Sequence, residues 1–170
     1  MIAFITESRI KDFTVVLGNV DAKLISPLIP TLADMWIKDR LGSYFYEDIL
    51  TKYNNQTLAG KEVELVDIIQ QTLLWRAASD IAITTAFQLT NKGPQEQNGI
   101  NSTPAGQSNV SLISKHYQQK AEYYDARLVS YLKLNKDDFP MFTDKLNNNS
   151  SIVDVVPNKK SGYNKDITFF

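Results

Sequence analysis

The stretch from Lys61 to Thr90 constrains the fold more than any other part of the chain. It reads KEVELVDIIQQTLLWRAASDIAITTAFQLT and contains neither proline nor glycine. It is rich in Leu, Ala, Glu and Gln, residues that favour helices. At 1.5 Å per residue, a helix over this stretch would be about 45 Å long. We therefore predict one long helix here.

The apolar residues of this predicted helix do not keep to a single stripe, and a helix that is apolar nearly all round is a buried helix. Charged residues interrupt the stretch too often for a membrane span, which needs about 20 mostly apolar residues. We therefore predict an all-α fold, a small helical bundle around this central helix. The two apolar sides are Leu65, Ile69, Leu73, Ile83 and Phe87 on one, and Ile68, Trp75, Ala82, Ala86 and Leu89 on the other.

Length and composition limit the function classes. A chain of 170 residues is typical of one domain with room for a core. Its net charge of −1 gives no reason to expect electrostatic capture of nucleic acid or of an anionic membrane. There is no cysteine, which excludes disulfides, thiolate nucleophiles and cysteine metal sites. The first residues lack the basic start and long apolar run of a signal peptide, so we expect synthesis and use in a cytoplasm.

The N-terminal third predicts several shorter helices. Residues 1–5 are predicted to form a short extended arm, and Thr6 and Asp21 are suitable N-caps for the two segments that follow. A helix is predicted over Ala22–Leu41, but proline at its position 30 should kink or restart it, with Thr31 capping the restarted part. The chain then turns at a glycine, and a further helix is predicted over Tyr44–Tyr53.

The second half contains one more long helix and a tail. Asn91–Asn109 is polar and rich in Gly and Pro, which predicts a long surface loop. Apolar residues then recur at three and four positions over Val110–Leu134, which predicts an amphipathic helix packed on the central one. The turn at 137–142 is expected to tuck two phenylalanines against the bundle. We place the boundary between a helical domain and an extended C-terminal tail after Phe142, so that the tail is 143–170.

The tail carries two short apolar pieces, Ile152–Val156 and Ile167–Phe170. If they were exposed to solvent, these apolar pieces would favour association with other proteins. Docking as an added strand or in a groove would cover them. We hypothesise that these pieces, the N-terminal arm and the turn after the second long helix contact other subunits or partners. The residues in this hypothesis are Ile2, Phe4, Phe139, Phe142, Ile152, Val153, Val155, Val156, Phe169 and Phe170.

No residue pattern points to catalysis, to a cofactor or to a metal. His116 is the only histidine and has no clustered ligands, so a packing or surface role is favoured. There is no GxxxxGK[ST] or GxGxxG loop and no serine in a nucleophile-elbow context. We therefore predict that the protein is not an enzyme and has no catalytic, cofactor-binding or metal-binding residues.

Arg76 and Asp80 lie four residues apart on the central helix. They could form a charged site in a cleft, or a buried or half-buried ion pair that fixes the register of neighbouring helices. We favour the structural ion pair. Asp80→Ala is then expected to cost stability, because it would leave Arg76 without its partner.

The order of elements resembles the head-to-tail connector proteins (adaptor, or neck ring) of tailed bacteriophages, particularly forms from phages of Bacteroidetes, including crAss-like phages. The likeness extends over about 1–142 and lies mainly in layout. The residues that carry it are Asp21-x-x-Leu24-Ile25-x-x-Leu28-Ile29, Arg40-Leu41-Gly42 followed by Tyr44 and Tyr46, Trp75-Arg76-Ala77-Ala78, Tyr117-x-x-x-Ala121-x-x-Tyr124-x-x-x-Leu128, and Phe139-Pro140-x-Phe142.

The resemblance implies a structural virion protein without a cofactor, a homo-oligomer of twelve copies in a ring beneath the portal protein. Such a ring extends the channel for the packaged DNA without sequence-specific binding and offers a platform for other neck and tail proteins. It lies in the virion neck, is assembled in the host bacterial cytoplasm and makes no contact with a membrane. Two alternatives stay open: a tail-completion or stopper protein, and a small helical regulatory or nucleic-acid-binding protein.

Overall fold

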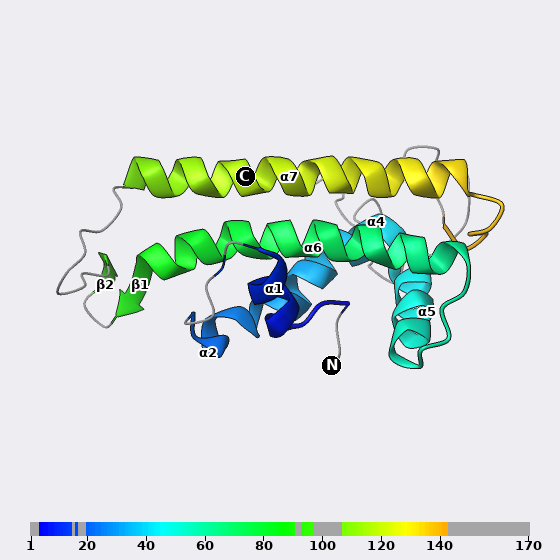
Figure 1. Cartoon of the computed structure of the whole chain (residues 1–170), viewed down its shortest axis with the longest axis horizontal. Coiled ribbons are helices and arrows are strands. Elements are labelled where there is room, and N and C mark those ends of the chain that lie inside the picture. The colour runs from blue at the N-terminus through cyan, green and yellow to red at the C-terminus, as the bar shows by residue number, and fades with distance from the viewer. Residues whose placement is uncertain (1–3, 15, 17–19, 91–92, 97–106, 143–170) are drawn as a thin grey trace, which may run out of the picture.

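The computed structural model describes residues 4–14, 16, 20–90, 93–96 and 107–142. The fold is all-α and has three layers (Figure 1). The long helix α6 (Lys61–Ala86) is the middle layer, and α7 (Gln107–Leu134) lies antiparallel along one side of it. Short N-terminal helices cover the other side: α1 (Glu7–Phe13), α2 (Ala22–Ile25), α3 (Leu28–Leu32) and α5 (Ser43–Asn54), with a π-helical segment η1 (Ala33–Lys38) and α4 (Asp39–Leu41) between the last two.

Helix α6 is buried around most of its circumference, as its sequence predicts. Because layers cover it from two sides, apolar residues such as Leu65 and Leu74 are buried although they lie on opposite faces of the helix. Together with the apolar residues of the N-terminal layer and of α7, they form one continuous core. None of the helices in the described part of the chain is long and apolar enough to cross a membrane.

The contact between α6 and α7 is close because small residues meet there. The Ser79 hydroxyl donates to the Ser114 carbonyl oxygen over 3.1 Å, and the two hydroxyl oxygens are 2.9 Å apart. Nearer the start of α6, the Tyr131 hydroxyl donates to the Lys61 carbonyl oxygen over 3.1 Å. Ala121 of α7 is fully buried between these two points. The amphipathic helix predicted from Val110 to Leu134 is therefore confirmed, starting three residues earlier.

The break in the second predicted helix occurs before Pro30 rather than at it. α2 ends at Ile25, and α3 restarts at Leu28. Pro30 is then in the first turn of α3, where a backbone N–H has no partner within the helix. The lack of an N–H at Pro30 therefore costs little stability. Thr31 does not cap the restarted helix, because its hydroxyl donates back to the Pro27 carbonyl oxygen over 3.2 Å. The N-caps predicted at Thr6 and Asp21 are confirmed.

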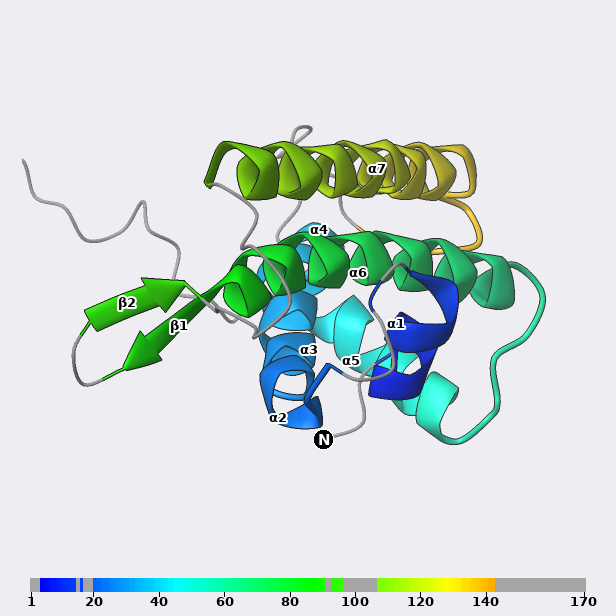
Figure 2. The same cartoon turned by 60° about the vertical axis from the view of Figure 1, so that its left-hand side comes forward.

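Gly42 separates α4 from α5 and has φ +82° and ψ 152°. This backbone conformation is essentially restricted to glycine. Its N–H donates to the Lys38 carbonyl oxygen over 2.9 Å, which ends the preceding helix. The chain can therefore reverse direction here, and α5 packs beneath the start of α6 (Figure 2).

The prediction that the central helix continues to Thr90 is wrong at its C-terminal end. α6 ends at Ala86, and strands β1 (Phe87–Thr90) and β2 (Gly93–Glu96) form an antiparallel hairpin (Figure 2). The hydroxyls of Thr84 and Thr85 donate back to carbonyl oxygens of the last helical turns. β-Branched and aromatic residues favour extended chain, so this segment leaves the helix once α7 no longer covers it. The predicted polar loop Asn91–Asn109 therefore contains β2, and its partner β1 is formed by the last residues of the predicted helix.

Candidate interaction surface

Phe4 lies in the core of the protein itself, which corrects the hypothesis that it contacts a neighbour. Its side chain is fully buried, with ring centroids 5.6 Å from Tyr46 and 5.5 Å from Tyr53. Gln70 Nε2 donates to the Phe4 carbonyl oxygen over 2.8 Å. The N-terminal segment is thus fixed between α5 and α6, and burying its aromatic ring stabilises the fold. Ile2 lies outside the described residues.

Phe139 is also buried, with ring centroids 5.6 Å from Phe45 and 6.1 Å from Tyr131. Phe142 is half-buried against the same core. The prediction that this turn tucks two phenylalanines against the bundle is confirmed, and the hypothesis that Phe139 is an interface residue is wrong. The hypothesised tail contacts at Ile152, Val153, Val155, Val156, Phe169 and Phe170 lie outside the described residues.

Arg76 is a buried cation that forms no ion pair with a carboxylate among the described residues. Only 7% of its surface is exposed, and its guanidinium carbon lies 3.7 Å from the centroid of the Trp36 ring. Nε of Arg76 is buried and has no hydrogen-bond partner. Burial lowers the pKa of Arg76, and the negative charges of Asp125, Glu122 and Asp80 oppose that shift. The cation is held by the aromatic face of Trp36, and the nearby carboxylates favour its charged form without pairing with it.

The predicted ion pair between Arg76 and Asp80 is not formed, because no N–O distance within 4 Å joins these two described residues. The pair that does form joins different elements. Arg40 of α4 donates from Nη2 to Asp125 Oδ2 over 2.7 Å and from Nε to Asp125 Oδ1 over 3.1 Å. This bidentate contact is the strong geometry for arginine and carboxylate, and it raises the pKa of Arg40. It ties α7 directly to the N-terminal layer.

The missing ion pair reverses the expectation for Asp80. Burial raises the pKa of its carboxyl group above the usual value, and Arg76 only partly opposes this shift. A folded-state pKa above the unfolded one means that stability falls as pH rises through the range between them. Asp80→Asn is therefore expected to raise the melting temperature slightly at pH 7. The difference should vanish near pH 3, below the ordinary aspartate pKa of about 3.9.

Asp67 offers a matched control, because it is an exposed aspartate on the same helix. Asp67→Asn should leave the melting temperature nearly unchanged at both pH values. A lower melting temperature of Asp80→Asn at pH 7 would show that Arg76 depends on this carboxylate after all.

An open groove of about 420 Å³ lies along the flank of α7, where Trp75 of α6 forms one wall. Its walls are aromatic: Trp75 stacks on Tyr117 with ring centroids 6.0 Å apart, and Tyr123 contacts Tyr124 edge to face at 5.3 Å. Lys120 Nζ lies 4.1 Å from the centroid of the Trp75 ring, a cation–π contact. The residues that line the groove are Trp75, His116, Gln119, Lys120, Tyr123 and Tyr124.

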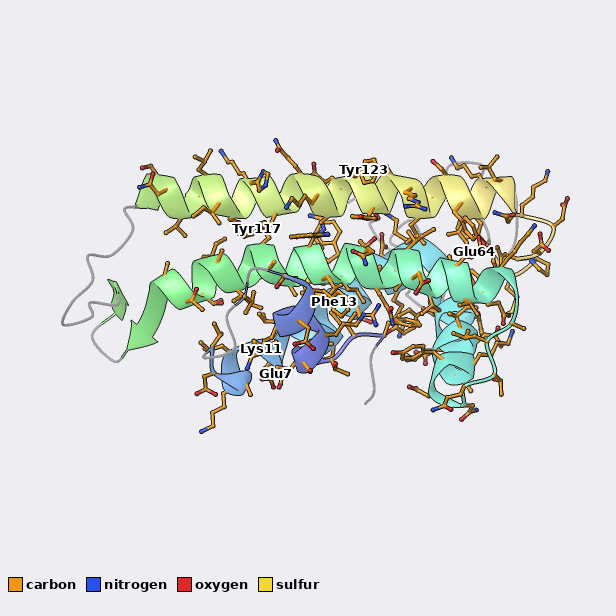
Figure 3. All side chains as sticks on the ribbon, in the orientation of Figure 1. Glu7, Lys11, Phe13, Glu64, Tyr117 and Tyr123 are labelled. Atoms are coloured by element: carbon orange, nitrogen blue, oxygen red, sulfur yellow. The ribbon has the colours of Figure 1, made fainter. Side chains whose placement is uncertain are left out.

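The outer side of α7, facing away from α6, carries large apolar side chains. Leu112, Tyr123 and Leu134 are 68%, 65% and 84% exposed. They are eleven residues apart, which is three turns, so they lie along one line on the helix. In Figure 3, Tyr123 projects outward from α7 while Tyr117 points toward α6. His116 is exposed beside this line, in agreement with the surface role favoured from the sequence.

Sequence reasoning missed the groove because its walls come from two helices, Trp75 from α6 and the others from α7. A signal was present: aromatic residues recur on both helices, and Lys120 lies among the tyrosines of α7. In the part of the chain that the structure describes, no group of three or more His, Cys, Asp or Glu side chains could hold a metal ion. The arrangement can bind an extended apolar segment or an aromatic ligand, and it positions one ammonium group inside the groove.

No curated protein matches the chain, and no solved structure does. One protein-family model matches residues 37–152, which covers α6 and α7 entirely and more than half of the chain. The chain therefore belongs to the family described as a family of unknown function (DUF6712).

Proposed function

We propose that the protein is a subunit of the head-to-tail connector ring of a tailed bacteriophage. In this function it docks beneath the portal protein in the virion neck, extends the DNA channel and offers a platform for tail proteins. The observation that carries the proposal is the line of exposed apolar side chains on α7, Leu112, Tyr123 and Leu134. Large apolar side chains exposed in line along one helix are typical of a protein–protein contact.

A second set of exposed apolar residues supports ring formation. Phe13, Met35 and Tyr44 are exposed on elements of the N-terminal layer, on the other side of α6 from α7. A cyclic ring needs each subunit to offer two different surfaces that fit one another. The two outer layers offer such a pair, because these exposed residues lie on different elements of the fold, three on α7 and three on the N-terminal layer.

Charge and resemblance support the same function. The net charge of −1 suits a channel wall past which DNA must move without being held. The order of elements resembles that of phage connector proteins, and such proteins act as subunits of a ring beneath the portal protein. Binding in this function is by contact between subunits, without a cofactor.

Mass measurement of the purified protein tests the proposal. We expect a ring of about twelve copies, alone or after addition of the portal protein of the same phage. Leu112→Glu should reduce ring formation at least tenfold, which corresponds to about 1.4 kcal/mol, because it places a charge on the contact line. Ser111→Glu is the matched control, since Ser111 is its exposed neighbour on α7. A protein that stays monomeric with and without the portal, or a dimer that shifts DNA at low salt, would contradict the proposal.

A further inference from the structure

The groove along the flank of α7 has the chemical character of a peptide site. Its walls are the rings of Trp75, Tyr123 and Tyr124, and one ammonium group, that of Lys120, lies over the Trp75 ring. Among the described residues, no carboxylate oxygen lies within 4 Å of Lys120 Nζ. An occupant that matches this groove is therefore apolar along its length and carries one negative charge near its middle.

The chain itself contains such a segment. Residues 152–156 read Ile-Val-Asp-Val-Val, four aliphatic residues around one aspartate. In an extended chain, alternate side chains point to the same face and are about 6.6 Å apart. Ile152, Asp154 and Val156 therefore share one face, with the carboxylate between two aliphatic groups.

We propose that the segment Ile152–Val156 docks, in an extended conformation, in the groove of its own subunit. The Asp154 carboxylate pairs with the Lys120 ammonium, while Ile152 and Val156 cover the rings of Trp75 and Tyr124. The mode is that of peptide recognition in a groove, in which alternate side chains fill pockets. This docking does not require ring formation. The sequence predicts that the tail contacts other subunits or partners, whereas here Ile152–Val156 binds the groove of its own subunit in the isolated chain.

The length of the chain permits this docking. Ile152 follows Phe142 by ten positions in the sequence, and an extended chain of that length spans at most about 33–36 Å. Lys120 lies fourteen residues before the end of α7, about 21 Å along the helix. The turn at Phe139–Phe142 packs back against the core near that end. The segment can therefore return along α7 to the groove with length to spare.

The absence of cysteine gives a clean test on the full-length protein. Gln119 lines the groove, whereas Gln118 is the adjacent exposed residue about 100° round the helix, with its Nε2 donating to Glu122 over 3.0 Å. Val153→Cys is combined with either Gln119→Cys or Gln118→Cys, and each variant is treated with a short thiol-specific cross-linker. We expect at least fivefold more product within one chain from the Gln119→Cys variant. Circular dichroism verifies that both variants are folded.

Charge exchange supplies the second readout. Adding Lys120→Glu should remove the excess product of the Gln119→Cys variant, and adding Asp154→Lys to that protein should restore it. Lys115→Glu is the matched control, because it makes the same charge change at an exposed position of α7 outside the groove. Equal yields from the two glutamine sites, a product that joins two chains, or no recovery on charge exchange would overturn the proposal. A monomer that cross-links as expected but forms no ring would refute only the proposed function.

Discussion

Replacing Ile69 by alanine is expected to lower the free energy of unfolding by about 3 kcal/mol, within the 2–5 kcal/mol typical of buried Ile→Ala changes. Ile69 is 0% exposed and lies in the middle layer of the fold. The substitution loses the free energy gained by burying the removed apolar groups away from water. It also leaves a cavity, because the closely packed helices around Ile69 cannot move in to fill it. For a domain of this size, we expect the melting temperature to fall by roughly 6–12 °C.

Ile83→Ala is the matched control for this experiment. It makes the same chemical change on the same helix, but Ile83 is 46% exposed. It should cost less than about 1 kcal/mol, because much of the side chain is already in water. Urea unfolding with an unchanged slope would verify that stability, and not the extent of unfolding, has changed. Equal losses from the two variants would contradict the assignment of α6 as the buried middle layer.

Asp125→Asn is expected to have the second largest effect, a loss of about 2–3 kcal/mol in the free energy of unfolding. The amide keeps the shape of the side chain but removes the charge that binds Arg40 in two hydrogen bonds and favours the charged form of Arg76. Removing one partner of a fully buried ion pair costs 3–5 kcal/mol. The expected loss is smaller because the Arg40 side chain is 45% exposed and can return to water.

Glu122→Gln controls for the change of charge on α7. Glu122 is an exposed carboxylate less than one turn from Asp125, and its contact is to Gln118 on the same helix. Its replacement should cost less than about 0.5 kcal/mol, as is usual for surface positions. A double-mutant cycle with Arg40→Gln should show coupling between positions 40 and 125. Additive losses would show that the contact does not stabilise the fold.

The helices could be predicted from the sequence because their signals are local. The spacing of apolar residues predicts α6 and α7, and the side chains of Thr6 and Asp21 predict two helix starts. The end of α6 could not be predicted in this way. Its last residues are compatible with helix or strand, and the outcome depends on which neighbouring helix still covers them.

The candidate site was less predictable, because its contacts join distant parts of the chain. Arg40 and Asp125 are 85 residues apart, so no spacing rule relates them. The sequence instead predicted a pair between Arg76 and Asp80, since residues four apart on a helix are neighbours. In the structure, the Arg76 guanidinium contacts the aromatic ring of Trp36 and not that carboxylate. The location of Phe4 could not be predicted from the sequence either. An apolar residue near a terminus can pack in the core or contact a partner, and only the three-dimensional packing distinguishes the two.

The separation of the two sides of α7 has a consequence for how such proteins can diverge. The residues that hold α7 to α6 include Ser79, Ser114 and Ala121, and their small size leaves little freedom for substitution. The residues on its outward line are mostly exposed, so their replacement is expected to change stability little. Substitutions on the outer face of α7 alone can therefore change what the protein binds during evolution, while the packing of α7 on α6 stays the same.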